Sequence, residues 1–211
     1  MPQVAVQQEL TAICSAAGLP LIVGCRYFRS FLSSERATDM LQTLWAELSW
    51  QQKPIRLFGR LVMQPRLISW HCDPGLRYSY SGLELQPAAW HPQLAALRIR
   101  LQAELGREFN SVLVNAYRDG QDSMGWHADD EPELGPDPVL ASISLGAERR
   151  FRWRDTTTRK TSGMKLQHGS LLMLSGQFQN RHQHSVPKTR LEVGLRINLT
   201  FRNILVRQSN Y

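Results

Sequence analysis

A histidine and a carboxylate two residues apart stand out in "GWHADDEPE", residues 125–133. In extended backbone, His127 and Asp129 point to the same face, where they can fill two positions of a metal site. A histidine from "RHQHSVP", either His182 or His184, would complete the two-histidine, one-carboxylate set that binds non-haem iron(II) and leaves three positions open. By itself a His-x-Asp pair is more often a hydrogen-bonded surface pair, so an iron site needs further support.

A strand near the C-terminus supplies that support. In "RINLTFR" polar and apolar residues alternate, so one face of the strand would carry Arg196, Asn198, Thr200 and Arg202. Arginines inside a sheet are costly unless carboxylates neutralise them, and guanidinium is suited to bidentate binding of a carboxylate. An interior arginine near an open iron site therefore favours a small dicarboxylate co-substrate. The alternative is a solvated arginine face with the apolar face turned inward.

The charge of the chain is unevenly distributed. There are 25 Lys and Arg residues against 18 Asp and Glu, yet residues 119–137 hold seven of the acidic residues and no Lys or Arg. The rest of the chain has 25 basic and 11 acidic residues, a net charge of +14. This excess favours a polyanionic partner, because phosphate backbones are bound largely through Lys and Arg. The alternative is that the charge only keeps the protein soluble.

Length and composition indicate an ordinary globular protein. We expect one domain over residues 1–211, with no membrane span, because no apolar run reaches about 18–20 residues. The three cysteines, Cys14, Cys25 and Cys72, are widely spaced, which favours free thiols in a reducing compartment. With no signal peptide, basic localisation cluster or long tail, we expect a location in a bacterial cytoplasm, associated with the nucleoid. A monomer is the default expectation.

Two helices are predicted to precede a series of strands. Apolar spacing predicts a helix from about Glu35 to Leu48, capped by Ser33 or Ser34, and a second from about Ala88 to Leu105, capped by Gly106. The first helix would have on one side Met40, Leu41, Leu44, Trp45 and Leu48. After residue 110 come short, β-branched or alternating segments separated by turn residues. This order predicts an α+β fold with helices against a sandwich, jelly roll or barrel.

Five segments carry a family resemblance. "NAYRDGQDSMGWHADDE", "ASISLGAERRFRWR", "HGSLLMLSG", "HSVP" and "RINLTFRNI" resemble, in order and spacing, the AlkB family of iron(II)/2-oxoglutarate-dependent nucleic-acid dealkylating dioxygenases. The likeness runs from about Arg56 to Leu205, and "LFGRLVMQPR" with "GLRYSYSG" resembles the duplex-DNA repair branch. It implies a double-stranded β-helix (jelly roll) with buttressing helices, a catalytic core at 108–205 and a nucleotide-recognition lid at 50–85. Residues 1–30 would be an N-terminal extension without an assigned role.

The resemblance also implies a ligand set. Iron(II) would be bound by His127, Asp129 and His184. His184 is preferred because it directly precedes the Ser-hydrophobe-Pro turn, and His182 remains an alternative. Arg196 would pair with the C5 carboxylate of 2-oxoglutarate, and Arg202 would lie at the other end of the co-substrate. The remaining co-substrate residues would be Asn115, Tyr117 and Asn198.

A third set of residues would read the nucleic acid. Asp130 and Glu131 would contact the exocyclic amine of a flipped base, where carboxylates favour cationic lesions such as 1-methyladenine and 3-methylcytosine. Phe58, beside Gly59, would be an apolar wedge that fills the gap left by the flipped base. Tyr78 and Tyr80 would line the base pocket, with Arg66 and Arg77 at phosphates. The alternatives are a core position for Phe58 and ordinary sheet positions for the tyrosines.

The implied activity is oxidative demethylation of alkylated DNA, using iron(II), O2 and 2-oxoglutarate and releasing formaldehyde and succinate. One alternative is a dioxygenase of the same fold acting on RNA or a protein side chain. Another is a non-catalytic, basic DNA-binding protein whose His/Asp cluster is structural. A zinc hydrolase fits less well, because it would have no use for an arginine pocket that binds a dicarboxylate.

Overall fold

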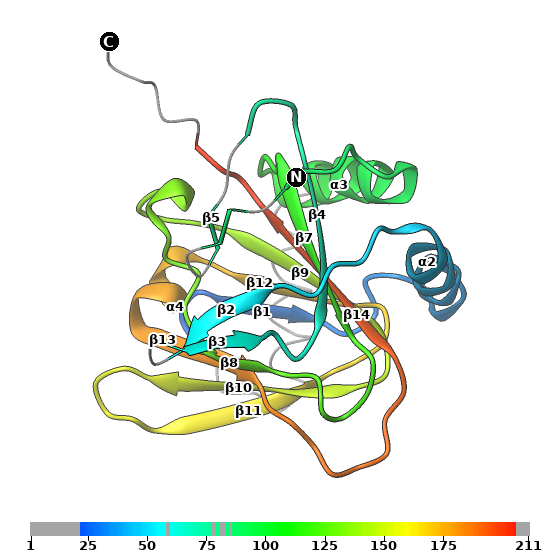
Figure 1. Ribbon diagram of the computed structural model, residues 1–211. Helices are drawn as coiled ribbons and strands as arrows, with labels where there is room; N and C mark the ends of the chain where they lie inside the picture. Colours follow the sequence, from blue (N-terminus) through cyan, green and yellow to red (C-terminus); the bar gives the residue numbers. More distant parts are fainter. Residues whose placement is uncertain (1–21, 58–59, 77–78, 81–82, 85, 206–211) are drawn as a thin grey trace.

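The computed structural model describes residues 22–57, 60–76, 79–80, 83–84 and 86–205. Within them, two antiparallel sheets form the body of the protein (Figure 1). The larger sheet contains, in order, β1 (Cys25–Phe28), β12 (Ser170–Leu174), β9 (Leu140–Gly146), β14 (Arg196–Arg202), β7 (Ser111–Tyr117) and β4 (Leu67–Cys72). The smaller contains β11 (Thr161–Leu166), β10 (Arg149–Asp155), β13 (His182–Val186) and β8 (Met124–His127).

Two short hairpins and four helical segments complete the described chain. The hairpins pair β2 (Pro54–Leu57) with β3 (Arg60–Met63), and β5 (Ser79–Tyr80) with β6 (Leu83–Glu84). The helices are α2 (Ser34–Glu47), α3 (Pro92–Leu105), the 3-10 turn η1 (Pro132–Leu134) and α4 (Gly176–Arg181). No helix among the described residues is long and apolar enough to cross a membrane.

Helices α2 and α3 cover the outer face of the larger sheet (Figure 1). Met40 and Leu44 of α2, with Leu94 and Leu101 of α3, are at most 1% exposed and belong to one core cluster with the central strands. Burying each such side chain contributes about 1.5–3 kcal/mol. The predicted α+β jelly roll with buttressing helices is thus confirmed.

Three details of the predicted elements differ from the structure. Helix α3 begins at Pro92 instead of Ala88, because His91 caps it and Pro92 takes its first position. Trp45, predicted on the same side of the helix as Leu44, is 39% exposed and packs against Trp50, whereas Leu44 is fully buried. Residues 25–28, expected in an N-terminal extension, form β1 and pair with β12.

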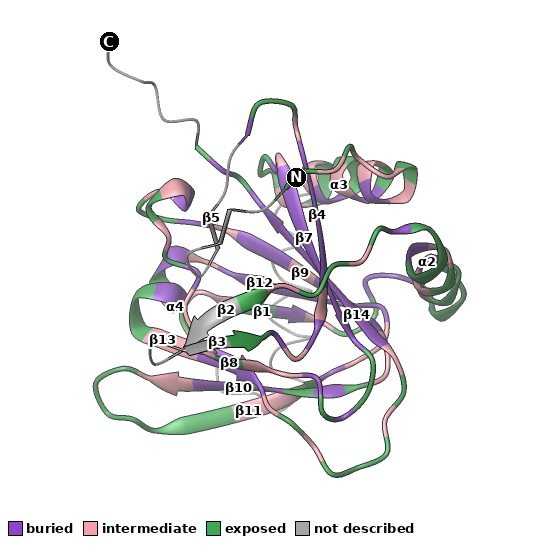
Figure 2. Cartoon of the chain, in the orientation of Figure 1, coloured by how far each residue is buried: buried purple, intermediate pink, exposed green. Residues whose placement is uncertain are grey.

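The two faces of the central strand β14 contact different environments, the apolar core and a polar cavity. All seven of its residues are buried (Figure 2). Ile197, Leu199 and Phe201 join the core beneath the helices. The alternate residues, which are polar, line a cavity between the sheets together with residues of β8, β10 and β13. The alternative of a solvated arginine face is therefore excluded, and the interior of the jelly roll contains the polar site.

Candidate active site

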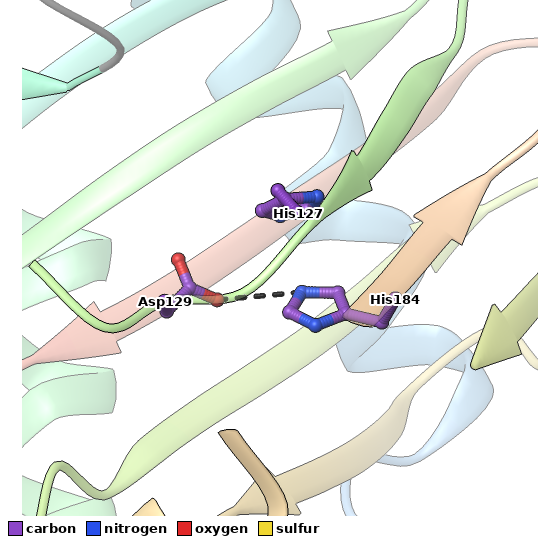
Figure 3. A group of neighbouring side chains, drawn as sticks. All are labelled: His127, Asp129 and His184. Atoms are coloured by element: carbon purple, nitrogen blue, oxygen red, sulfur yellow. Dashed lines mark ion pairs between the residues drawn. The ribbon is translucent and has the colours of Figure 1, made fainter. Parts of the chain in front are cut away.

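His127, Asp129 and His184 form a compact cluster (Figure 3) and line this cavity. One potential ligand atom from each lies within 4.8 Å of the others. His127, at the end of β8, stands directly opposite His184 of β13 in the strand register, and Asp129 follows two residues beyond β8. His184 Nε2 is 3.3 Å from Asp129 Oδ2. The predicted triad is therefore assembled by pairing two neighbouring strands.

His182 does not join the cluster. Its ring stacks on Phe178 with a centroid separation of 4.8 Å, and its Nδ1 lies 3.3 Å from the Phe178 carbonyl oxygen. Because successive side chains of a strand point to opposite faces, residues 182 and 184 share a face but lie about 7 Å apart along the strand. Only the position of His184 is level with His127, which disfavours His182 as a ligand.

Neighbouring groups orient the three side chains. The Nδ1 atom of His127 lies 2.9 Å from the carbonyl oxygen of Gly125, to which it donates when protonated, leaving Nε2 as the lone-pair atom. Asp129 Oδ1 accepts from Arg202 Nη2 at 2.6 Å. The backbone N–H of Asp129 donates to Oε1 of Gln179 at 3.1 Å.

The electrostatics favour the protonation states that a metal requires. Burial, and then the neighbouring His184, lowers the pKa of His127 to about 3, so this imidazole is neutral. Burial by itself would raise the pKa of Asp129, but the Arg202 guanidinium and the two histidines hold that pKa well below its usual value. Two imidazoles and an ionised carboxylate fit iron(II), which takes this donor set with positions left open.

Arg196 adds a second buried guanidinium to the lining of the same cavity. Arg196 is 1% exposed, and its Nη2 donates to Ser144 Oγ at 2.9 Å and to Asn198 Oδ1 at 2.8 Å. Its Nε and Nη1 have no hydrogen-bond partner in the described part of the chain. Its guanidinium lies 5.0 Å from the centre of the Tyr117 ring, and burial lowers its pKa.

The two arginines of β14 differ in their partners. Arg202 pairs with Asp129, whereas Arg196 has no carboxylate partner among the described residues. A buried guanidinium with two unused donors is suited to a carboxylate ligand. The cavity brings together all eight residues predicted for iron and 2-oxoglutarate: Asn115, Tyr117, His127, Asp129, His184, Arg196, Asn198 and Arg202.

Arg66 lies in the interior, which does not fit its predicted contact with phosphate. It is 3% exposed, and its Nε donates to Asn115 Oδ1 at 2.8 Å. Its positive charge also contributes to the lowered pKa of His127. A guanidinium buried in this way cannot reach a phosphate on the surface, and it orients the Asn115 amide instead.

The structure describes only some of the other residues predicted to bind the substrate. Asp130 is exposed and Glu131 is partly buried, immediately after Asp129 and before η1. Tyr80 lies in β5. Phe58, Gly59, Arg77 and Tyr78 lie outside the described residues.

Several contributors to the site were not predicted from the sequence. Ser144 and Gln179 hold Arg196 and Asp129, and Ser142 donates to Asn198 Oδ1 at 3.0 Å. Asn198 in turn donates to Thr200 Oγ1 at 2.7 Å, so this predicted co-substrate residue also supports Arg196. The alternation in "ASISL" could have indicated the serines, since Ser142 and Ser144 pair with Thr200 and Asn198 across β9 and β14. Gln179 has no local signal of this kind.

Comparisons with known proteins agree with this geometry. The 2OG-Fe(II) oxygenase superfamily model matches residues 24–202. Human alpha-ketoglutarate-dependent dioxygenase alkB homolog 3 is 36% identical over 187 residues, which are 84% of this chain and 65% of that protein. Human DNA oxidative demethylase ALKBH2 is 37% identical over 193 residues, which are 86% of this chain and 74% of that protein.

A solved structure supports the fold. The structure of OsALKBH1 matches with a TM-score of 0.60 at 19% identity, covering 87% of this chain and all of that one. The family model covers most of the chain, and the metal cluster and the arginine face occupy one cavity. The chain therefore belongs to the 2OG-Fe(II) oxygenase superfamily and, within it, to the AlkB family of iron(II)/2-oxoglutarate-dependent dioxygenases.

Proposed function

We propose that this protein oxidatively demethylates N-alkylated bases in DNA, with 1-methyladenine and 3-methylcytosine as substrates and iron(II), O2 and 2-oxoglutarate as reactants. The products are the restored base, formaldehyde, succinate and carbon dioxide. The proposal rests mainly on one observation, that the buried Arg196, with no carboxylate partner among the described residues, shares a cavity with the His127–Asp129–His184 cluster. The names of the relatives, which include a DNA oxidative demethylase, support DNA as the substrate.

The residues of the chain divide the work between them. His127, Asp129 and His184 hold iron(II), which when bound supplies the oxidising chemistry with 2-oxoglutarate and O2. Arg196 binds the distal carboxylate of 2-oxoglutarate through its unused Nε–H and Nη1–H donors. Arg202 keeps the Asp129 carboxylate ionised and oriented. The protein thereby fixes the positions of the reactants before reaction, which is its main contribution to the rate.

Asp130 and Glu131 are proposed to select the lesion. They are the first and second residues after Asp129 in the chain and add two carboxylates at that point. A cationic base such as 1-methyladenine is attracted to this charge, whereas its neutral parent is not. The basic remainder of the chain would bind the phosphates.

The test is turnover by purified protein reconstituted with iron(II). Oligonucleotides with one 1-methyladenine or 3-methylcytosine would be incubated with 2-oxoglutarate and O2. Restored base would be measured by mass spectrometry, with formaldehyde and succinate measured alongside. We expect equal amounts of all three products, and loss of all three in His127→Ala.

RNA oligonucleotides of the same sequence would be the parallel arm. Turnover of RNA with none of DNA would overturn the DNA assignment. Succinate formation without repair of either polymer would retain the co-substrate chemistry and point to a different substrate. Binding of DNA that is insensitive to chelators, with no succinate formed, would favour the non-catalytic alternative.

A further inference from the structure

The short helix α4 is connected to two residues of the metal cluster, Asp129 and His184. It begins after Ser175, and its C-cap, His182, is the first residue of β13, so that His184 follows two residues later. Gln179, in this helix, is 2% exposed. Its Oε1 accepts the backbone N–H of Asp129 at 3.1 Å, across 50 residues of sequence. Helix α4 is thus continuous with β13, the strand that carries His184. Through Gln179 it is also hydrogen-bonded to the backbone of Asp129.

This hydrogen bond acts where the strand ladder has ended. Strand β8 stops at His127, and His127–His184 is the last pair at that end of its register with β13. The Asp129 side chain is oriented by Arg202, but the backbone that carries it is held by Gln179. A carboxylate on unsupported backbone could move relative to His127 and His184, and metal sites tolerate little such movement.

The nitrogen of the Gln179 amide, unlike its oxygen, makes no hydrogen bond to the described residues. Because a backbone N–H can only donate, the amide oxygen must face Asp129, which fixes the orientation of the group. Its Nε2 is then buried without a hydrogen-bond partner among the described residues. An apolar side chain of the same length would remove this unpaired donor but would leave the buried N–H of Asp129 without its acceptor. The two costs oppose each other, so the amide contributes little net stability to the fold.

We propose that Gln179 is a positioning residue that holds the backbone of Asp129 in register with His184, so that α4 supports both ligands at once. This inference rests on the proposed iron site. A neutral amide suits the task because it accepts the N–H without adding charge beside the Asp129–Arg202 pair. A carboxylate in its place would also accept the N–H, whereas a thioether would not.

Three variants separate this role from simple packing. Gln179→Met keeps the length of the side chain but removes the strong acceptor, and Gln179→Glu keeps the acceptor. Gln177→Met, at an exposed position of the same helix, is the matched control. The readouts are anaerobic iron(II) titration of metal-free protein, followed by the weak visible band that appears with 2-oxoglutarate, and thermal unfolding of the metal-free protein.

We expect Gln179→Met to bind iron(II) about 10–100-fold more weakly, the usual effect of removing a group that orients a ligand, with a melting temperature close to that of the wild type. Gln179→Glu should retain most of the affinity, and Gln177→Met all of it. Wild-type affinity in a folded Gln179→Met would overturn the proposal. If Gln179→Met fails to fold, a folded Gln179→Glu that binds as weakly as His127→Ala would overturn it. Absence of iron binding by the wild type would instead refute the proposed iron site itself.

Discussion

The Nη2 atom of Arg202 lies 2.6 Å from Oδ1 of Asp129, joining the end of β14 in the larger sheet to the segment after β8 in the smaller one. Both side chains are at most 5% exposed. A buried pair of this kind stabilises only while both partners are present and ionised, because either charge alone would be left in the interior without compensation. The carboxylate of the metal cluster therefore also contributes to the joining of the two sheets.

The first prediction concerns this pair and its dependence on pH. Because the folded-state pKa of Asp129 is depressed, its stabilisation is fully present above the unfolded-state value of about 3.9 and is lost as pH falls through the lower folded value. Arg202→Met removes the cation, so burial should raise that pKa and move acid unfolding to higher pH. At pH 7 the metal-free variant should lose about 3–5 kcal/mol of unfolding free energy in urea.

Arg36→Met is the control for this prediction. Its partner Asp39 lies one turn along α2, and both side chains are about half exposed. Such a pair contributes about 0–1 kcal/mol, so the acid-unfolding midpoint should barely move. An Arg202→Met protein with the acid unfolding of the wild type would contradict the prediction.

The second prediction distinguishes the two histidines of β13. His184→Ala should abolish measurable iron(II) binding, because it removes one of three ligands. His182→Ala should bind iron(II) with nearly unchanged affinity, because its ring packs on Phe178 outside the cluster. Anaerobic titration of both variants checks this, and equal losses in the two would mean that His182 supplies the third ligand.

The third prediction concerns Arg196. Arg196→Met should raise the KM for 2-oxoglutarate by about 10–100-fold, since charged hydrogen bonds contribute about 1.5–3 kcal/mol each. Iron(II) affinity should stay near the wild-type value, because Arg196 contacts no residue of the cluster directly. The variant should also be no less stable than the wild type without ligand, as a buried cation with unused donors has been removed. Weaker iron binding with an unchanged KM would contradict this assignment.

The fourth prediction tests the wedge hypothesis for Phe58. Phe58→Ala should reduce repair of duplex DNA by about 10-fold or more, because lost stacking of a few kcal/mol is no longer offset. Repair of the same lesion in a single strand should be nearly unaffected. Rates for both substrates, measured side by side, decide the matter. Equal losses on the two substrates would refute the wedge.

The metal ligands and β14 could be predicted from the sequence because their pattern is local. Strict alternation in residues 196–202 indicated which side chains share a face, and the structure buries them all. The His-x-Asp spacing likewise puts two ligands together over three residues. The family resemblance then chose His184 over His182, and the strand register agrees by pairing His184 with His127.

The supporting contacts could not be predicted because they join distant segments. Arg66 meets Asn115 across 49 residues and Gln179 meets Asp129 across 50, and neither segment carries a pattern that indicates its partner. An arginine in a basic chain suggests a phosphate contact unless its burial is known, which explains the wrong expectation for Arg66. Periodicity grouped Trp45 with the apolar residues of α2, but in the structure it is 39% exposed and packs against Trp50.

The direct pairing of His127 with His184 determines which segments of the chain can be exchanged without disturbing the metal cluster. The separation of these two side chains is set by backbone hydrogen bonds between β8 and β13, and Asp129 is anchored from β14 and α4. None of these anchors comes from the β2–β3 or β5–β6 hairpins. The metal cluster and the two hairpins are therefore held by different contacts, and we expect that exchanging a hairpin with that of a relative would leave iron(II) affinity near that of the wild type.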